Sequence, residues 1–166
     1  MKMKKLLLLL LIISPVTLHS QVYITPYVSS GYINHLGRKG INTELGVEAE
    51  LFKRLDLSFS YRYTKANRDV GNEVTISGLT SNISYILINR NDHRFMLGPG
   101  LTFGRYTRYT DYFGFEKEYK SLWFDYLKLR YDYTINEKIR VGTIVNLTGD
   151  DGDSSTYFGL LIGYKF

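Results

Sequence analysis

Apolar and polar residues alternate with a period of two along most of the chain beyond residue 20. Segment 55–65 is the clearest case, because Leu57, Phe59 and Tyr61 occupy one phase and the residues between them are polar. This period is typical of β-strands, whose side chains point alternately to opposite faces of a sheet. No apolar run in this part of the chain approaches the roughly 20 residues of a membrane-spanning helix. The pattern therefore predicts an all-β fold.

The alternation recurs often enough to predict eight strands, at 22–33, 41–51, 55–65, 73–88, 94–105, 119–134, 138–148 and 157–166. In two of them the apolar phase shifts, near Gly78 and near Asp125, and we interpret each shift as a β-bulge. The connections alternate in length. Long polar loops are expected at 34–40, 65–72, 106–118 and 148–156, and short turns near 52–54, 89–93 and 135–137. An even number of antiparallel strands with this alternation is the plan of an eight-stranded up-and-down transmembrane barrel.

The polar phase of these strands carries charges of both signs, which could pair inside a packed lumen. They are Glu44, Glu48, Glu50, Asp56, Arg62, Lys128, Arg130, Asp132, Arg140 and Lys165. A soluble barrel would instead turn its apolar phase inward. Here that phase ends in tyrosine and phenylalanine, which suit the two interfaces of a membrane. We therefore expect the apolar face to meet lipid and the charges to form an internal ion-pair network. Eight strands leave an interior that side chains fill, which disfavours a diffusion channel.

The N-terminus has the layout of a secretory signal peptide. Lys2, Lys4 and Lys5 precede an apolar run at 6–13. We expect cleavage after Ser20, which leaves one domain at 21–166. Cleavage removes three lysines and no acid, so the formal charge falls from +5 to +2. A charge this small does not indicate a nucleic-acid-binding protein. The chain has no cysteine, no phosphate-binding loop and no zinc-ligand spacing, so neither a cofactor nor a metal is expected.

The final segment, YFGLLIGYKF, places aromatic and aliphatic residues in step up to the last residue: Phe158, Leu160, Ile162, Tyr164 and Phe166. In this motif, and in the strand pattern of 21–166, the chain resembles the small eight-stranded outer-membrane barrels of the OmpA-transmembrane and OmpX type. The resemblance implies the outer membrane of a Gram-negative bacterium, with both termini periplasmic after signal cleavage. It also implies that the last strand is an assembly signal for the barrel-assembly machinery, and that outer-membrane lipids and lipopolysaccharide surround the barrel.

One arrangement could support catalysis. Closure of the barrel would bring the last loop near His35, where Ser154 or Ser155 and Asp151 or Asp153 could complete a Ser–His–Asp arrangement. Outer-leaflet lipid A acyl hydrolases and transferases are barrels of this kind. The chain lacks the His-x-Ser strand motif of the deacylase type and the second-loop Asp-Ser pair of the palmitoyltransferase type. We therefore expect no enzyme, and we keep His35, Asp153 and Ser154 as the catalytic candidates.

The third long loop, YTRYTDYFGFEKEYK, interleaves aromatic rings with cations. Such residues are typical of surfaces that bind proteins or glycans. The candidates for binding an extracellular ligand are Arg108, Tyr109, Tyr112, Phe113, Phe115 and Lys117. In the alternative interpretation the loop continues its two strands above the membrane, and its rings form the upper aromatic girdle. The sequence thus favours a non-enzymatic barrel with a structural or surface-interaction role. The alternatives are the lipid A enzyme, a narrow pore, and a soluble secreted barrel that binds an apolar ligand.

Overall fold

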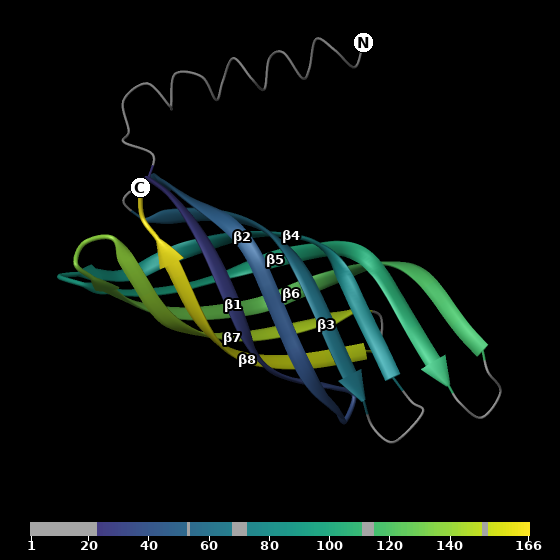
Figure 1. Cartoon of the computed structure of the whole chain (residues 1–166). Coiled ribbons are helices and arrows are strands. Elements are labelled where there is room, and N and C mark those ends of the chain that lie inside the picture. Colours follow the sequence, from purple (N-terminus) through teal and green to yellow (C-terminus); the bar gives the residue numbers. More distant parts are fainter. Residues whose placement is uncertain (1–22, 53, 68–72, 111–114, 151–152) are drawn as a thin grey trace, which may run out of the picture.

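The computed structural model describes residues 23–52, 54–67, 73–110, 115–150 and 153–166. These residues form eight β-strands that pair in sequence order and close into one antiparallel barrel (Figure 1). The strands are β1 (Tyr23–His35), β2 (Arg38–Phe52), β3 (Leu55–Asn67), β4 (Glu73–Arg90), β5 (His93–Thr110), β6 (Phe115–Ile135), β7 (Ile139–Asp150) and β8 (Asp153–Tyr164). Over the described ranges, no helix has the length and apolar character needed to cross a membrane. The predicted all-β, eight-stranded antiparallel fold is confirmed.

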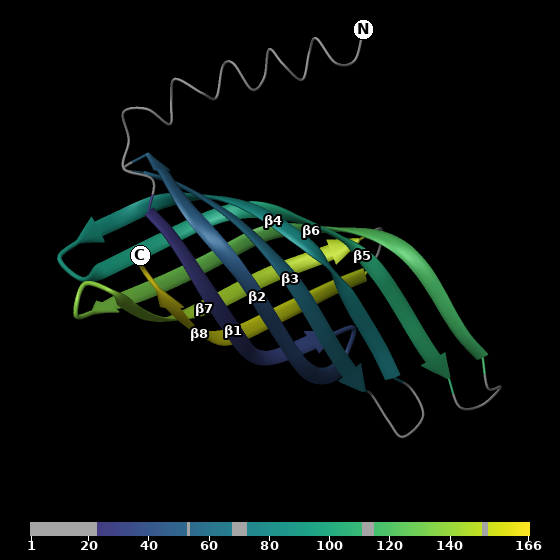
Figure 2. The same ribbon diagram turned by 45° about the horizontal axis from the view of Figure 1, so that its top comes forward.

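The strands are steeply staggered around the barrel (Figure 1 and Figure 2). The register can be traced once around the barrel, from Tyr23 on β1 to its partner on β2 and so on to β8. This path returns to β1 at Ile33, which is ten residues after Tyr23. A stagger of this kind tilts the strands, and with eight strands it leaves an interior that side chains fill. We call the end that carries Tyr23 and Phe166 the terminal end, and the opposite end, with the turn between β1 and β2, the loop end.

The barrel is polar inside and apolar outside. Along β3, Asp56 and Arg62 are buried, whereas Phe59, Tyr61 and Tyr63 expose 53 %, 51 % and 45 % of their surfaces. The same inversion runs along the other strands, so that large apolar side chains form the outer surface. Because the barrel is closed, each strand has hydrogen-bonded neighbours on both sides, as a lipid environment requires. The sequence-based prediction that the apolar phase faces outward is confirmed.

The connection between β1 and β2 is a tight turn, and the predicted long loop at 34–40 is wrong. Strand pairing continues until Leu36 and Gly37, whose φ angles are +50° and +75°. Positive φ at both central residues is the requirement of a type I′ hairpin turn. The Asn34 Oδ1 accepts a hydrogen bond of 3.1 Å from the Gly37 N–H. Polar residues here continue the ladder because polarity alone does not end a strand.

The other predicted loops are also too wide. Strand pairing enters 65–72 as far as Asn67, and it enters 148–156 from both sides. In 106–118 the ladder reaches the pair Thr110–Phe115, so this region largely continues β5 and β6. Towards the loop end, Phe124 is the last residue of β6 that pairs with β7. Beyond it β6 pairs only with β5, and the β5–β6 hairpin projects at the loop end (Figure 1 and Figure 2).

One of the two predicted bulges is present. The register slips between Asp125 and Leu127 of β6, which confirms the bulge at this position. The bulge at Gly78 is wrong, because this residue pairs regularly on both sides. The apolar phase shifts there because Val74 and Ile76 point into the lumen near the loop end, where the interior is apolar.

The turn at Gly37 provides a test of the hairpin geometry. A Cβ added to Gly37 would meet no atom within 4 Å, so the cost of Gly37→Ala arises from the left-handed backbone alone. We expect the free energy of unfolding to fall by about 1–2 kcal/mol. Urea unfolding of the barrel in lipid vesicles measures this loss. Gly37→Asn is the control and should lose less, because asparagine adopts this conformation more readily. An alanine variant as stable as the wild type would contradict the turn assignment.

Candidate functional site in the barrel lumen

Nearer the loop end, the lumen contains a neutral group of two acids and two cations. Arg62 on β3 donates from Nε to Glu44 on β2 at 2.8 Å, and its two terminal nitrogens reach both oxygens of Asp125 on β6 at 2.9 and 2.8 Å. Lys128 Nζ lies 3.4 Å from the second Glu44 oxygen. We call these four residues the upper ion cluster. Its side chains are almost fully buried, and the bidentate Arg62–Asp125 pair has the geometry of a strong charge-assisted interaction.

A second group of charges, the lower ion cluster, fills the lumen toward the terminal end. At its centre Glu48 on β2 is contacted by Arg94, Arg130 and Arg140, which come from β5, β6 and β7. Arg94 also contacts Asp56 at 2.9 Å. The full cluster is Glu48, Glu50, Asp56, Arg94, Arg130, Asp132 and Arg140. Because these ion pairs join five strands across the lumen, they brace the barrel from the inside.

The sequence pattern points to the lumen residues only in part. Nine of the ten charged residues expected to pair belong to the two clusters: Glu44, Glu48, Glu50, Asp56, Arg62, Lys128, Arg130, Asp132 and Arg140. The tenth, Lys165, forms no ion pair with another described residue. Sequence reasoning misses Arg94 and Asp125. Arg94 shares the inward phase of the buried Met96 and could have been found from it, whereas Asp125 is noticed only as the position of the bulge.

An aromatic layer occupies the lumen at the loop end. His35 lies against Trp123 and Tyr106, with ring centroids 5.4 and 5.9 Å apart, and the last two rings stack on each other. Val74 and Ile76 pack against this group. We call these five residues the aromatic plug. Together with the two ion clusters, it fills the lumen from the loop end toward the terminal end.

The catalytic candidates are brought together only in part. His35 Nδ1 lies 2.6 Å from Ser155 Oγ, and both side chains are buried. Ser154 is exposed, and the side chain of Asp153 lies outside the part of the chain that is described. A cavity of about 10 Å³ adjoins Ser155 and Trp123, which is room for about one water molecule. The geometry therefore supports a hydrogen bond that stabilises the aromatic plug, and this one cavity among the described residues is too small for an acyl chain.

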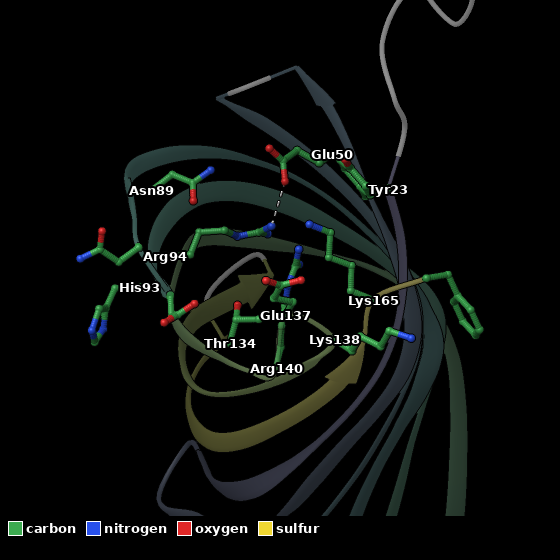
Figure 3. A pocket seen from close by; sticks show the side chains of 13 residues that line it. Tyr23, Glu50, Asn89, His93, Arg94, Thr134, Glu137, Lys138, Arg140 and Lys165 are labelled. Carbon is green, nitrogen blue, oxygen red and sulfur yellow. Dashed lines mark hydrogen bonds and ion pairs between the residues drawn. The ribbon is translucent and has the colours of Figure 1, made fainter.

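The terminal end opens into a vestibule with a volume of about 620 Å³. Arg94 and Lys165 extend into it from opposite sides (Figure 3), and the Lys165 ammonium lies 4.0 Å above the Tyr23 ring. Lys165 makes no ion pair with another described residue, unlike the charges deeper in the lumen. Arg94 and Arg140 belong both to the vestibule and to the lower ion cluster. The vestibule therefore ends on buried ion pairs.

The surface candidates lie on the outside and at the loop end. Five residues of the proposed assembly signal are exposed on one face of the closing strand and the residues after it: Phe158, Leu160, Ile162, Tyr164 and Phe166. Among the ligand-binding candidates, Arg108 is exposed on β5. The side chains of the others lie outside the described part of the chain: Tyr109, Tyr112, Phe113, Phe115 and Lys117. Their role in binding stays a prediction.

A closed eight-stranded barrel with a charged, packed lumen and an apolar outer surface is the fold of the small outer-membrane β-barrels, and this protein has that fold. Neisserial surface protein A superposes with a TM-score of 0.70 at 14% identity, covering 89% of this chain and 98% of that one. The N-terminal barrel domain of OprF from Pseudomonas aeruginosa gives a TM-score of 0.62 at 14% identity, covering 88% and 100%.

A third similar structure is Ail, the attachment invasion locus protein of Yersinia pestis, in complex with the heparin analogue sucrose octasulfate. Its TM-score is 0.50 at 15% identity, and the match covers 87% of this chain and 97% of Ail. No protein-family profile matches the chain, and no curated protein sequence matches it significantly. Identities at this level show a shared fold.

Proposed function

We propose that the protein is a non-enzymatic integral protein of the bacterial outer membrane that serves as a rigid scaffold and presents its loop end to the outside. The observation that carries this proposal is the inversion of the barrel. Leu45 and Leu160 expose 67 % and 66 % of their surfaces, while Glu44 and Glu48 are buried. Exposure of this apolar outer surface to water would cost free energy, whereas its contact with the acyl chains of a bilayer would not.

The proposed orientation puts both ends of the mature chain, 21–166, in the periplasm after removal of residues 1–20. Two features support it. The β5–β6 hairpin extends at the loop end beyond the last residue pair between β6 and β7, as expected of an extracellular extension. The closing strand carries its exposed apolar residues up to Phe166, as expected of a signal for the barrel-assembly machinery. The lipids around the barrel would then include lipopolysaccharide.

The proposed interaction surface is the β5–β6 hairpin, whose ligand would be an extracellular protein or glycan. Arg108 is exposed there, and the neighbouring sequence is rich in aromatic and basic residues. Ail, which shares this fold, forms a complex with a heparin analogue, so a barrel of this size can present a surface to a sulfated glycan. Enzymatic and pore functions receive less support, because the cavity beside His35 is small and two ion clusters occupy the lumen.

Membrane fractionation tests the proposal. We expect the mature protein in the outer-membrane fraction, and we expect the unheated sample to migrate faster than the boiled one on a gel, because a closed barrel resists detergent. The control is Phe166→Ala with Tyr164→Ala, which should lower the folded fraction by weakening the assembly signal. Recovery of the wild-type protein in the soluble periplasmic fraction without detergent would instead favour a soluble barrel.

A further inference from the structure

The outer face of the β5–β6 hairpin changes abruptly from apolar to charged on the way to the loop end. Register places outward-facing residues of the two strands directly opposite each other. In order toward the loop end, these pairs are Leu101–Phe124, Phe103–Leu122, Arg105–Lys120 and Thr107–Glu118. Their side chains are exposed except that of Thr107, which is half-buried. The change from apolar side chains to cations marks the level at which lipid tails would give way to headgroups.

Below this boundary the outer surface is hollowed into a groove of about 420 Å³ between β4, β5 and β6. Ser81 leaves space there, because this small residue lies in register between Phe59 of β3 and Leu101 of β5. Leu101, Phe124 and Tyr126 line the groove, and the last two rings stack with centroids 6.4 Å apart. The bulge at Asp125 lies beside the groove, and the Asp125 side chain is turned into the lumen. The groove is therefore apolar toward the membrane and has the character of a seat for an acyl chain.

Above the boundary the two cations Arg105 and Lys120 face each other across neighbouring strands. Like charges in directly opposed positions destabilise a sheet unless an anion lies between them. Glu118 contacts Arg105 at 3.3 Å, but both side chains are more than half exposed, so this ion pair is weak. Lys120 has no acidic partner in the described part of the chain. Arg105 and Lys120 together thus retain a local excess of positive charge over Glu118.

We propose that this face binds a phosphorylated glycolipid of the outer leaflet, with a phosphate between Arg105 and Lys120 and one acyl chain in the groove. Leu101 and Arg105 are four residues apart on β5, as are Phe124 and Lys120 on β6, which separates the groove from the cations by about 13 Å. A headgroup phosphate and its acyl chain can span this distance. The site rests on the proposed function, because the orientation proposed there puts the loop end in the leaflet that carries lipopolysaccharide.

Direct binding tests the site. The folded barrel in detergent is titrated with diphosphoryl lipid A, monophosphoryl lipid A or phosphatidylglycerol, and binding is followed by native mass spectrometry. We expect diphosphoryl lipid A to bind most tightly. Arg105→Gln with Lys120→Gln should weaken its binding roughly tenfold, because each interfacial cation contributes appreciably to the attraction of anionic lipids. Ser81→Phe, which fills the groove, should weaken both forms of lipid A.

The matched control also removes one arginine and one lysine, but at the terminal end. Arg54→Gln with Lys138→Gln changes the net charge equally, and both positions are exposed. This control should bind lipid A as the wild type does. The site would be overturned if the wild type and the Arg105/Lys120 variant bound diphosphoryl lipid A with equal affinity. It would also be overturned if the wild type bound phosphatidylglycerol as tightly as diphosphoryl lipid A. Heat-modifiable migration is measured on each sample. If the wild type showed no heat-modifiable migration, the barrel itself, and with it the proposed function, would be contradicted. If it migrated as a folded barrel but failed the lipid-binding test, only the proposed site would be contradicted.

Discussion

Arg62→Met is expected to lower the free energy of unfolding by about 3–5 kcal/mol, which is the usual cost of removing one partner from a buried ion pair. Arg62 is 5 % exposed and contacts both Glu44 and Asp125. Methionine fills a similar volume but leaves Asp125 without its main partner in a lumen with little water. Reversible urea unfolding of the barrel in lipid vesicles, followed by tryptophan fluorescence, measures the loss.

Two variants show whether this loss comes from an uncompensated charge. Lys65→Met removes the exposed ion pair of Lys65 with Glu73 at the loop end and should have little effect, since exposed pairs contribute little. Arg62→Met combined with Asp125→Leu should recover much of the stability lost in the single variant, because Glu44 keeps Lys128 and no new charge is stranded. If Arg62→Met is no more harmful than Lys65→Met, the upper ion cluster does not stabilise the barrel.

Leu45→Arg is expected to lower the free energy of unfolding by about 2–4 kcal/mol in lipid vesicles, the cost of arginine near the middle of a bilayer. Leu45 lies midway along β2 and exposes 67 % of its surface. In a soluble barrel an arginine at such an exposed position would contact water and change stability little. The size of the loss therefore tells whether this surface faces lipid or water.

The same substitution nearer the membrane surface is the matched control. Ile41 lies on the same strand and face, four residues closer to the loop end, and exposes 63 % of its surface. Ile41→Arg should cost only about 0–1 kcal/mol, because the charge can reach the headgroups. Urea unfolding in the same vesicles compares the two variants. Equal losses at both positions would contradict a bilayer centred near Leu45.

The loop-end interior shows how a local pattern can mislead. Val74 and Ile76 interrupt the alternation of 73–88, and from the sequence the interruption looks like a bulge at Gly78. In the folded barrel the register is regular, and the two residues pack with Trp123 in the aromatic plug. An inward apolar layer and a bulge produce the same shift of phase. Only the neighbours across the lumen distinguish them.

The sequence by itself determined the features that depend on local alternation. Period two specifies a strand and its two faces, so the strands, their outward apolar phase and most of the lumen charges could be predicted before any pairing was known. The mixed signs of the inward charges also indicated that they pair. Since these properties belong to individual strands, residues such as Phe59 and Arg62 report them wherever the strand lies.

Only the tertiary structure decided which strands extend and which charges meet, because both depend on register and stagger around a closed barrel. The ends of strands are set by backbone pairing, and polar residues near Gly37 pair as well as apolar ones do. The stagger brings Arg62 to Asp125 and His35 to Ser155, which are 63 and 120 residues apart in the chain. Alternation within one strand carries no information about contacts at such separations.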